Sequence, residues 1–363
     1  QKMIREFSNK ELKPIAQTID KDSIFPKESI KKLSKLGLMG IPWPSKYGGS
    51  DMDYISLAIV IEEIAKVCVS TAVTLMAHTS LGSGPFYLFG NEEQKNKYLP
   101  KLSTGEIIGS FALTEPNAGS DAGNTQTIAV LKDDKFIVNG QKVFCTNAGY
   151  AGVLIFTAKI IEDEEEQGIG ALFVDAGTEG LNLGEPENKM GWKGSDTRSV
   201  FFDNMEISSN NILGNPEKGF NQFLQTLTGG RITIAALALG ISQGAYNAAL
   251  HYSKEREAFG KKINKFQAIS FKLADMATQI EASKHLVYNA AWLKDQNKKI
   301  IKEAAMAKLF SSEVAMSITT EAIQIHGGFG YIREYNVERF FRDAKILEIG
   351  EGTSEVQRIV ISR

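Results

Sequence analysis

The sequence is short of several features that commonly define a function. Only two cysteines, Cys68 and Cys145, occur among 363 residues, too few for a disulfide framework, which indicates a reducing compartment. The 41 lysines and arginines nearly balance the 43 aspartates and glutamates, and this argues against a surface that neutralises nucleic-acid phosphates. No uninterrupted apolar run reaches the roughly 18 residues of a membrane span, so we expect no such span.

Nucleotide-binding and metal-binding signatures are also missing. No G-x-G-x-x-G follows a strand and opens a helix, and no G-x-x-x-x-G-K-[ST] occurs, which excludes the usual nicotinamide fingerprint and the P-loop. The four histidines show no metal-ligand spacing, so we expect no metal site. Because the chain begins at Gln1 rather than methionine, we expect that residues precede it, and a targeting peptide could be among them.

The pattern of apolar residues that is present changes twice along the chain. Residues 1–108 read as helices joined by short loops, and residues 54–68 keep one apolar face over four turns. Residues 217–363 are helical again and read as a bundle of long helices. Between them, residues 109–216 show a period near two, with candidate strands at Ile128–Leu131, Lys135–Val138, Val153–Lys159, Ala171–Val174 and Arg198–Phe202. This order does not alternate strand and helix, so a doubly wound sheet is not expected.

Turn signals divide the strand-rich block. Asp133-Asp134 and Asn139-Gly140 are typical of tight turns between strands. The acidic run Glu162–Glu166 lies between two strand-like segments, and we interpret it as a solvated hairpin loop.

Two segments in the strand-rich block could hold a ligand. The loop Thr114–Gly123 follows an apolar strand, Ile107–Leu113, and its exposed backbone N–H groups could cradle a phosphate or the edge of a ring. An ordinary turn explains the same residues equally well. In Phe144–Ala148, an aromatic and a small hydroxyl would suit a planar ring, although a core aromatic is the simpler interpretation. Cys145 reads as a packing residue rather than a nucleophile.

Three further segments lie in the C-terminal helical block. Arg256–Ile263 is a basic interhelical loop, which fits either solvent exposure or pyrophosphate binding by Arg256. Gln324–Gly330 carries three glycines that either cap a helix or bring backbone close to a ligand. In Glu351–Arg358, Ser354 and Gln357 form a capping-box pattern that starts a helix. Glu351 just precedes that helix, and spacing alone does not single it out among 43 acidic residues.

Four motifs occur together: F-A-L-T-E-P-N-A-G-S-D, R-E-A-F-G-K-K-I, Q-I-H-G-G-F-G and E-G-T-S-E-V-Q-R. In this order and spacing the chain resembles the acyl-CoA dehydrogenase family over essentially its whole length, and most closely the short-chain, butyryl-CoA-type members. The resemblance implies an α+β, mostly α fold. Its parts would be an N-terminal helical domain (1–108), a small β-sheet, barrel-like middle domain (109–216) and a C-terminal four-helix bundle (217–363).

The resemblance also implies a reaction, in which FAD accepts hydrogen during α,β-dehydrogenation of an acyl-CoA thioester. Glu351 occupies the position of the base that removes the α-proton while the β-hydrogen leaves as hydride to flavin N5. The thioester oxygen would then be hydrogen-bonded by the backbone N–H of the base and by a ribityl hydroxyl, as enolate character develops. Electrons would pass to an electron-transfer flavoprotein, as in β-oxidation of fatty acids.

The remaining site residues are implied residue by residue. The substrate would contact Ser120, Thr228, Arg231 and Gly352. Because the family's FAD sites straddle subunits, we expect a homotetramer, a dimer of dimers, in which Arg256, Phe259 and Gln267 reach the cofactor of a neighbouring subunit. The full set of expected FAD contacts is Phe111, Leu113, Thr114, Ser120, Phe144, Thr146, Arg256, Phe259, Gln267, Gln324, Ile325, His326, Gly327, Gly328, Thr353 and Glu355.

The chain departs from the family pattern at a few positions. Phe144 replaces a usual tryptophan and Phe111 a common tyrosine, and both remain aromatic. Gly350 stands where tyrosine is frequent, and Trp192 is bulkier than short-chain members lead us to expect, so chain length and branching of the substrate stay open. Gly230 lies near the position where isovaleryl-type members carry their base, and because glycine cannot serve, Glu351 is the better candidate.

Three other functions remain compatible with the sequence. An acyl-CoA oxidase would share the fold and the base, although such chains are commonly longer. An enoyl-CoA reductase in an electron-bifurcating complex would run the reaction in reverse. A catalytically inactive helical interaction protein is the alternative from another class. For the compartment we expect bacterial cytoplasm, with the mitochondrial matrix as the alternative.

Overall fold

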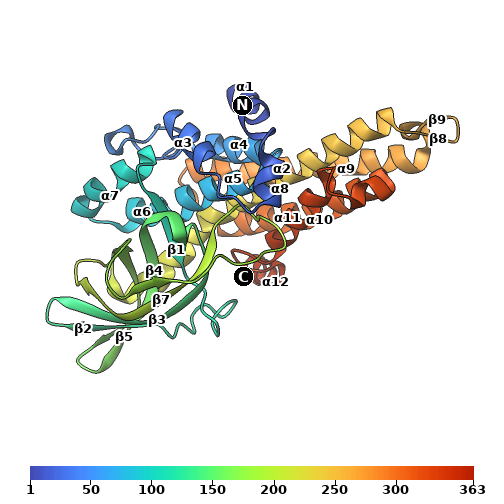
Figure 1. Cartoon of the computed structure of the whole chain (residues 1–363). Helices are drawn as coiled ribbons and strands as arrows, with labels where there is room; N and C mark the ends of the chain where they lie inside the picture. The colour runs from blue at the N-terminus through green and yellow to red at the C-terminus, as the bar shows by residue number, and fades with distance from the viewer.

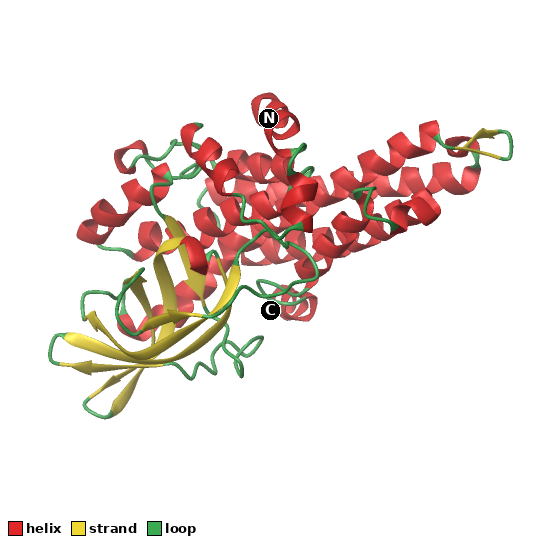
Figure 2. Cartoon of the chain, viewed as in Figure 1, coloured by secondary structure: helices red, strands yellow, loops and turns green.

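The computed structural model describes all 363 residues apart from the side chain of Glu217. It is 56% helical, and Figure 2 shows the large sheet at one end, helices filling the rest, and a helical arm on the opposite side with a short strand pair at its tip. Helices from both ends of the chain therefore flank one sheet, which confirms the expected α+β, mostly α fold.

The N-terminal part is entirely helical. The stretch expected from its apolar face is helix α4 (Tyr54–Ala65), which begins where the Asp53 carboxylate accepts a hydrogen bond from the backbone N–H of Ser56 (2.7 Å). The π-helical segment η3 (Ala77–Ser83) passes next to the sheet, because Gly82 packs against the backbone of Gly109. The other helices here are α1 (Lys2–Phe7), α2 (Ala16–Lys21), α3 (Lys27–Lys35), α5 (Val69–Met76), α6 (Gly84–Phe89) and α7 (Glu92–Thr104).

The middle part forms one curved seven-stranded sheet. Strand β4 pairs in parallel with β1 and β2 and antiparallel with β5, and the path continues through β3 and β7 to β6. The strands are β1 (Ile108–Ala112), β2 (Ile128–Lys132), β3 (Lys135–Thr146), β4 (Ala151–Glu162), β5 (Glu165–Asp175), β6 (Leu181–Leu183) and β7 (Thr197–Ser208). Figure 1 shows β1 on the side of the sheet that faces the helices.

One predicted turn is wrong and two are confirmed. Asp133-Asp134 turns the chain between β2 and β3, and the acidic run forms the exposed β4–β5 hairpin. Asn139-Gly140, however, lies inside β3 at a register shift, where the Asn139 side chain accepts a hydrogen bond from the N–H of Asn204 on β7 (2.8 Å). A β-bulge, in which glycine tolerates φ +150°, therefore uses the same residue pair that commonly makes a hairpin.

The C-terminal part is built on three long helices, α8 (Gly219–Glu255), α9 (Gln267–Asp295) and α10 (Ile301–His326), followed by α11 (Val337–Lys345) and α12 (Ser354–Ser362). By length and composition alone, α8 could cross a membrane. However, 78% of its most apolar window is buried inside the protein, which is the situation of a core helix. Beyond α8, the strands β8 (Glu257–Ala258) and β9 (Lys261–Lys262), of two residues each, form a short hairpin. The arm consists of the end of α8, this hairpin and the beginning of α9.

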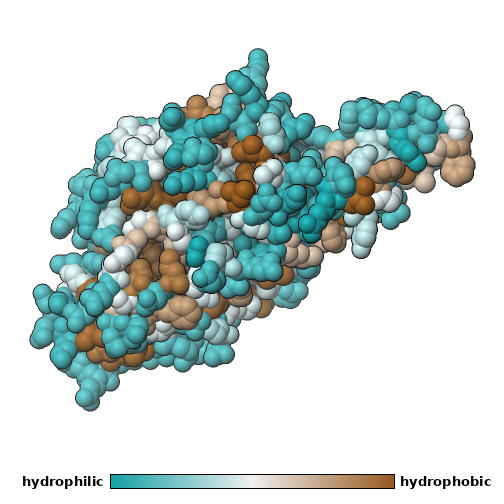
Figure 3. Space-filling view, in the orientation of Figure 1, coloured by the Kyte–Doolittle hydropathy of each residue, from teal (hydrophilic) through white to brown (hydrophobic). Residues whose placement is uncertain are grey.

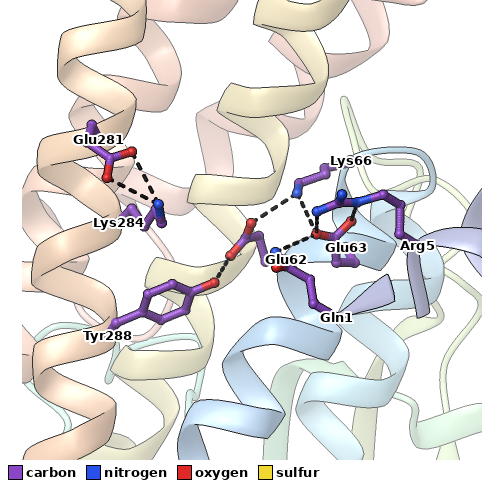
Figure 4. A network of polar contacts seen from close by, with 8 residues as sticks. All are labelled: Gln1, Arg5, Glu62, Glu63, Lys66, Glu281, Lys284 and Tyr288. Atoms are coloured by element: carbon purple, nitrogen blue, oxygen red, sulfur yellow. Dashed lines mark hydrogen bonds and ion pairs between the residues drawn. The ribbon is translucent and has the colours of Figure 1, made fainter. Parts of the chain in front are cut away.

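The N-terminal and C-terminal helices share one hydrophobic core, which joins α4 and α5 to α8, α9 and α10. A polar network spans the same junction (Figure 4): the buried carboxylates of Glu62 and Glu63 on α4 contact Arg5 of α1, Tyr288 of α9 and Lys66 at the end of α4 itself. The surface in Figure 3 is mostly hydrophilic with separate hydrophobic patches. The helical parts therefore form a single packed body beside the sheet.

Candidate active site

Glu351 lies in a turn between the short helix η8 (Ile346–Glu348) and α12, and its carboxylate faces α8. The Oε2 atom is buried without a hydrogen-bond partner among the described residues. An ideal Cβ on Gly230 would lie only 2.2 Å from this oxygen, so any side chain at position 230 would displace the carboxylate. Leu81 of η3 lies 3.3 Å from the same Cβ position. The carboxylate of Glu351, the expected base, therefore lies in tightly packed and partly apolar surroundings.

Two cations flank this carboxylate. Arg231 of α8 is 5% exposed and its Nε has no partner among the described residues, and Lys308 of α10 is 0% exposed. Burial raises the pKa of Glu351 to about 7, although Lys308 and Arg231 act in the opposite direction. Burial lowers the pKa of Lys308 to about 8, while Glu351 favours its charged form. A carboxyl with a pKa near neutral is suited to proton transfer.

The turn itself has an unusual backbone. Glu351 and Gly352 have φ angles of +53° and +91°, and the carbonyl of Gly352 accepts hydrogen bonds from Lys308 Nζ (2.7 Å) and Gln357 Nε2 (2.8 Å). The predicted capping box is wrong. Thr353 is the N-cap, with its hydroxyl accepting from Val356 N–H (3.3 Å), because the Gln357 side chain is turned toward the Gly352 carbonyl instead.

A buried ion pair braces the loop that follows β1. The Glu115 carboxylate accepts hydrogen bonds from the N–H groups of Gln126 (2.6 Å) and Thr127 (3.0 Å) and from Lys142 Nζ (2.7 Å). Lys142 also donates to the carbonyl of Leu113 (3.2 Å). Both charged side chains are buried, so they fix both ends of the expected flavin loop, while Ser120 at its middle is exposed.

The expected flavin-ring contacts come from neighbouring strands. Phe144 lies at a bulge in β3 with φ +58°, and its side chain is 66% exposed. The backbone of Thr146 is tied to β1, because its carbonyl accepts a hydrogen bond from the Ser110 hydroxyl (2.7 Å). Phe111 of β1 stacks on Phe223 of α8 with ring centroids 4.2 Å apart. The structure thus links Phe111 and Thr146 through β1, and Phe111 to the helix that carries Gly230.

A second candidate binding site lies at the C-terminal end of α8. Arg256 follows the end of this helix, and its guanidinium lies over the Phe329 ring at 5.6 Å from the centroid. A cavity of about 460 Å³ is lined by Tyr252, Arg256, Ile263, Gln324, Ile325, His326, Gly327, Gly328, Phe329 and Ile332. Nothing lies within 4 Å of a Cβ placed on Gly327 or Gly328, so their backbone faces open space. Two segments that the sequence singled out separately therefore share one cavity.

The other expected contacts are distributed as follows. Phe259, at the tip of the β8–β9 hairpin, is 95% exposed, and Gln267 begins α9 close by in the chain. Thr228 is half-buried on α8, three residues before Arg231, and Glu355 is exposed in the first turn of α12. The structure thus joins Glu351, Gly352 and Arg231, whereas Arg256, Phe259 and Gln267 lie apart from them on the arm.

Sequence reasoning missed the roles of Lys308 and Lys142. A usable signal existed for Lys308, because it shares helical spacing with the small, buried residues Ala304, Ser311 and Ala315. A lysine on such a face must be buried. Lys142 carried a comparable signal, since it stands among the inward-facing positions of β3.

Each of these two places fits one part of a flavin dinucleotide. The exposed aromatic ring of Phe144, the hydroxyl of Thr146, and the open glycine backbone beside Arg256 are the kinds of group that hold a planar ring and a pyrophosphate.

Comparison with known families decides the assignment. The acyl-CoA dehydrogenase N-terminal, middle and C-terminal domain models match residues 1–106, 110–205 and 217–363. The chain belongs to the acyl-CoA dehydrogenase family. The resemblance noted from the four motifs is thereby confirmed, and an acyl-CoA dehydrogenase is an oxidoreductase.

Several known proteins are similar to this chain over nearly its whole length. A probable acyl-CoA dehydrogenase, YngJ, of Bacillus subtilis is 52% identical over 99% of this chain and 95% of its own. The short-chain specific acyl-CoA dehydrogenase of Clostridium acetobutylicum is 47% identical, with the same two coverages. The caffeyl-CoA reductase–Etf complex subunit CarC of Acetobacterium woodii is 44% identical over 99% of this chain and 96% of its own.

Solved structures of similar proteins agree with the fold. Butyryl-CoA dehydrogenase from Megasphaera elsdenii is 45% identical with a TM-score of 0.96, over 99% of this chain and 95% of its own. A chain in a study of the electron transferring flavoprotein of Acidaminococcus fermentans is 47% identical with a TM-score of 0.97. The match covers 100% of this chain and 95% of that chain. A Bacillus anthracis acyl-CoA dehydrogenase complexed with FAD is 34% identical with a TM-score of 0.92, over 99% and 65%. FAD as the cofactor is thereby confirmed at the level of the family.

Proposed function

We propose that this chain dehydrogenates a short-chain acyl-CoA to the trans-2-enoyl-CoA, with Glu351 as the base. The observation that carries the proposal is the buried, unpartnered Oε2 of Glu351, held against Gly230 between two cations. An acyl chain bound at this place would remove water from the carboxylate and favour its reaction with the weakly acidic α C–H. Similarity to the short-chain specific relatives supports the short acyl group.

The surrounding residues account for the other requirements of this reaction. The backbone N–H of Glu351 makes no hydrogen bond among the described residues, so it is free to donate to the thioester oxygen, where negative charge develops. Arg231 and Lys308 keep a fraction of the carboxyl ionised before substrate binds. FAD, when bound through the residues around Phe144 and Thr146, would supply the hydride acceptor.

The decisive experiment is the Glu351→Gln variant. It should remain yellow and bind butyryl-CoA, but its flavin should not bleach under anaerobic conditions, because an amide cannot accept the α-proton. Glu348→Gln is the matched control, since Glu348 lies three residues away and its carboxylate pairs with Lys345 (2.6 Å). Normal bleaching in Glu351→Gln would refute the role of Glu351, and a colourless wild-type protein would favour the inactive alternative.

We further propose that electrons pass to an electron-transfer flavoprotein and that the enzyme is a homotetramer. Gly230 and Glu255 are separated by roughly 38 Å along α8 at 1.5 Å per residue, which exceeds the length of an extended FAD molecule. The cavity beside Arg256 is therefore too far away to hold the FAD that would bind near Glu351, and we assign it to the cofactor of a neighbouring subunit. Light scattering should give four chains per particle, and a monomer that retains FAD would overturn this assignment.

The reverse reaction is a second candidate because a specific similarity favours it. The caffeyl-CoA reductase–Etf complex subunit is similar over nearly the whole chain. Anaerobic bleaching of the flavin by saturated acyl-CoAs of increasing length and branching, compared with reoxidation by the matching enoyl-CoAs, separates the two directions. Rapid peroxide formation from butyryl-CoA without an added acceptor would instead identify an oxidase.

A further inference from the structure

The turn that carries Glu351 is held in a backbone conformation that its sequence does not favour. Glu351 is a non-glycine residue with φ +53°, and Gly352 follows with φ +91°. Left-handed backbone at a non-glycine residue costs about 1–2 kcal/mol and persists where the surrounding structure holds it. Something must therefore hold residues 350–353 in place.

Two buried side chains from different helices meet this turn at one atom. Lys308 of α10 and Gln357 of α12 are both 0% exposed, and both donate hydrogen bonds to the Gly352 carbonyl, at 2.7 Å and 2.8 Å. Gln357 Nε2 also lies 3.3 Å from the carbonyl of Glu351. The turn is thus held through its main-chain carbonyls, and the Cβ space of Gly352 is filled by Gln357, 2.8 Å away.

Lys308 does not need a positive charge to hold the turn by a hydrogen bond. A neutral donor, Gln357, already serves the same carbonyl, and burying an ammonium group is unfavourable. The charged groups that act on Lys308 are Glu351 in the turn, Arg231 on α8, Glu348 on η8 and Glu355 on α12, with Glu351 the strongest favourable one. A buried cation so placed favours the ionised form of Glu351.

We propose that Lys308 and Gln357 are positioning residues for the base. Together they hold the turn 350–353 so that the Glu351 carboxylate meets Gly230, and Lys308 in addition supplies a positive charge that keeps Glu351 ionised near neutral pH. This inference rests on the proposed function. It assigns different consequences to the two side chains, because only Lys308 carries a charge.

The test compares Lys308→Met, Lys308→Gln and Gln357→Leu in the FAD-loaded enzyme. We expect Lys308→Met to lower kcat about tenfold through misplacement of the base, and to move the acidic limb of the kcat/KM–pH profile upward by about one pH unit. Lys308→Gln keeps a donor, so it should recover part of kcat but show the same shift in pH. Gln357→Leu should lower kcat and leave the acidic limb where it is.

Lys189→Met is the matched control. Lys189 is also partly buried and donates to a main-chain carbonyl, that of Ser195 (2.8 Å), but the charges around it are Asp196, Glu187 and Lys193 rather than Glu351. This variant should keep the wild-type acidic limb. A shift equal to that of Lys308→Met would show that loss of any buried lysine produces the effect, and would overturn the proposal.

A readout independent of turnover separates this inference from the proposed function. An infrared pH titration of the carboxyl band, with Glu351→Gln as the blank, measures protonation of Glu351 directly. The midpoint should be higher in Lys308→Met and Lys308→Gln than in wild type. An unchanged midpoint would overturn the role of Lys308 even in an active enzyme, whereas absence of flavin bleaching in wild type would overturn the proposed function alone.

Discussion

At the scale of single residues, the ionised form of Glu351 is unfavourable in its own surroundings. Burial raises its pKa from 4.5 to about 7. Between these two pH values the folded state retains a proton that the unfolded state has lost, so the free energy of unfolding falls as pH rises through this window. Above pH 7 the full cost is present, on the order of 3 kcal/mol.

We therefore predict that Glu351→Gln stabilises the folded protein while abolishing proton abstraction. At pH 8 the neutral amide removes the cost of ionisation and should raise Tm by about 2–4 °C. At pH 5 wild-type Glu351 is already protonated in the folded state, so the gain should be small. Thermal unfolding of both holoenzymes at the two pH values checks this, and an equal gain at pH 5 and pH 8 would contradict the assigned pKa.

Gly230→Ala tests the fit between α8 and the base. A Cβ at 2.2 Å from Oε2 must move the carboxylate, and a displacement near 1 Å can cost about a hundredfold in rate. We expect kcat to fall by about that factor while FAD stays bound. Gly229→Ala is the control, since its Cβ would meet Lys294 at an ordinary 3.7 Å. Equal losses in both variants would show that flexibility of α8, rather than the contact with Glu351, matters.

At the scale of elements, the loop after β1 depends on one buried ion pair. Removing one partner of such a pair leaves an uncompensated charge and costs about 3–5 kcal/mol. We predict that Lys142→Met lowers Tm and releases FAD, because Lys142 fixes both Leu113 and Glu115. Absorbance of protein-bound flavin after gel filtration measures the loss.

Lys135→Met is the control for this prediction. Lys135 lies on the same strand and pairs with Glu206 (2.9 Å), but both side chains are more than half exposed. Exposed pairs contribute only about 0–1 kcal/mol, so this variant should keep its flavin and its Tm. Equal flavin loss in the two variants would contradict the bracing role of Lys142.

Elements with a strong periodic pattern could be predicted from the sequence, and those whose residues serve tertiary contacts could not. The apolar face of α4 and the hairpin at Asp133-Asp134 follow from local physics and are confirmed. Asn139-Gly140 failed as a turn because Asn139 bonds across to β7, and Ser354 failed as a cap because Gln357 bonds to Gly352. Both competing contacts form only in the folded protein, so the local sequence pattern does not reveal them.

In the candidate site, too, some residues could be predicted from the sequence and others could not. Glu351 and the glycine loops were found through motif resemblance, and their roles stay predictions. Arg231, one of the two cations beside the base, was expected as a substrate contact, but Lys308 was not found. A buried lysine and a solvated lysine look alike in a sequence until the apolar face around the lysine is counted.

At the scale of the whole molecule, α8 runs from the base to the arm. The arm ends in Phe259, whose side chain is 95% exposed and so is available for packing against another chain. We predict that Phe259→Ser weakens subunit assembly and FAD retention together, because the ring would pack against a neighbouring subunit. Met3→Ser is the control, since Met3 is 53% exposed but lies outside the arm. Light scattering and flavin content check both, and loss of neither in Phe259→Ser would contradict the role of the arm.

The contact between Gly230 and Glu351 also limits how this enzyme could evolve. The space between α8 and the turn holds the side chain of Glu351 and has no room for a second side chain at position 230. A lineage that moved its base from the turn to α8 would have to shorten residue 351 before, or together with, the gain of a carboxylate at 230. Single substitutions in either order pass through an enzyme with no base or with a displaced one, so such a relocation requires paired change or a duplicated gene.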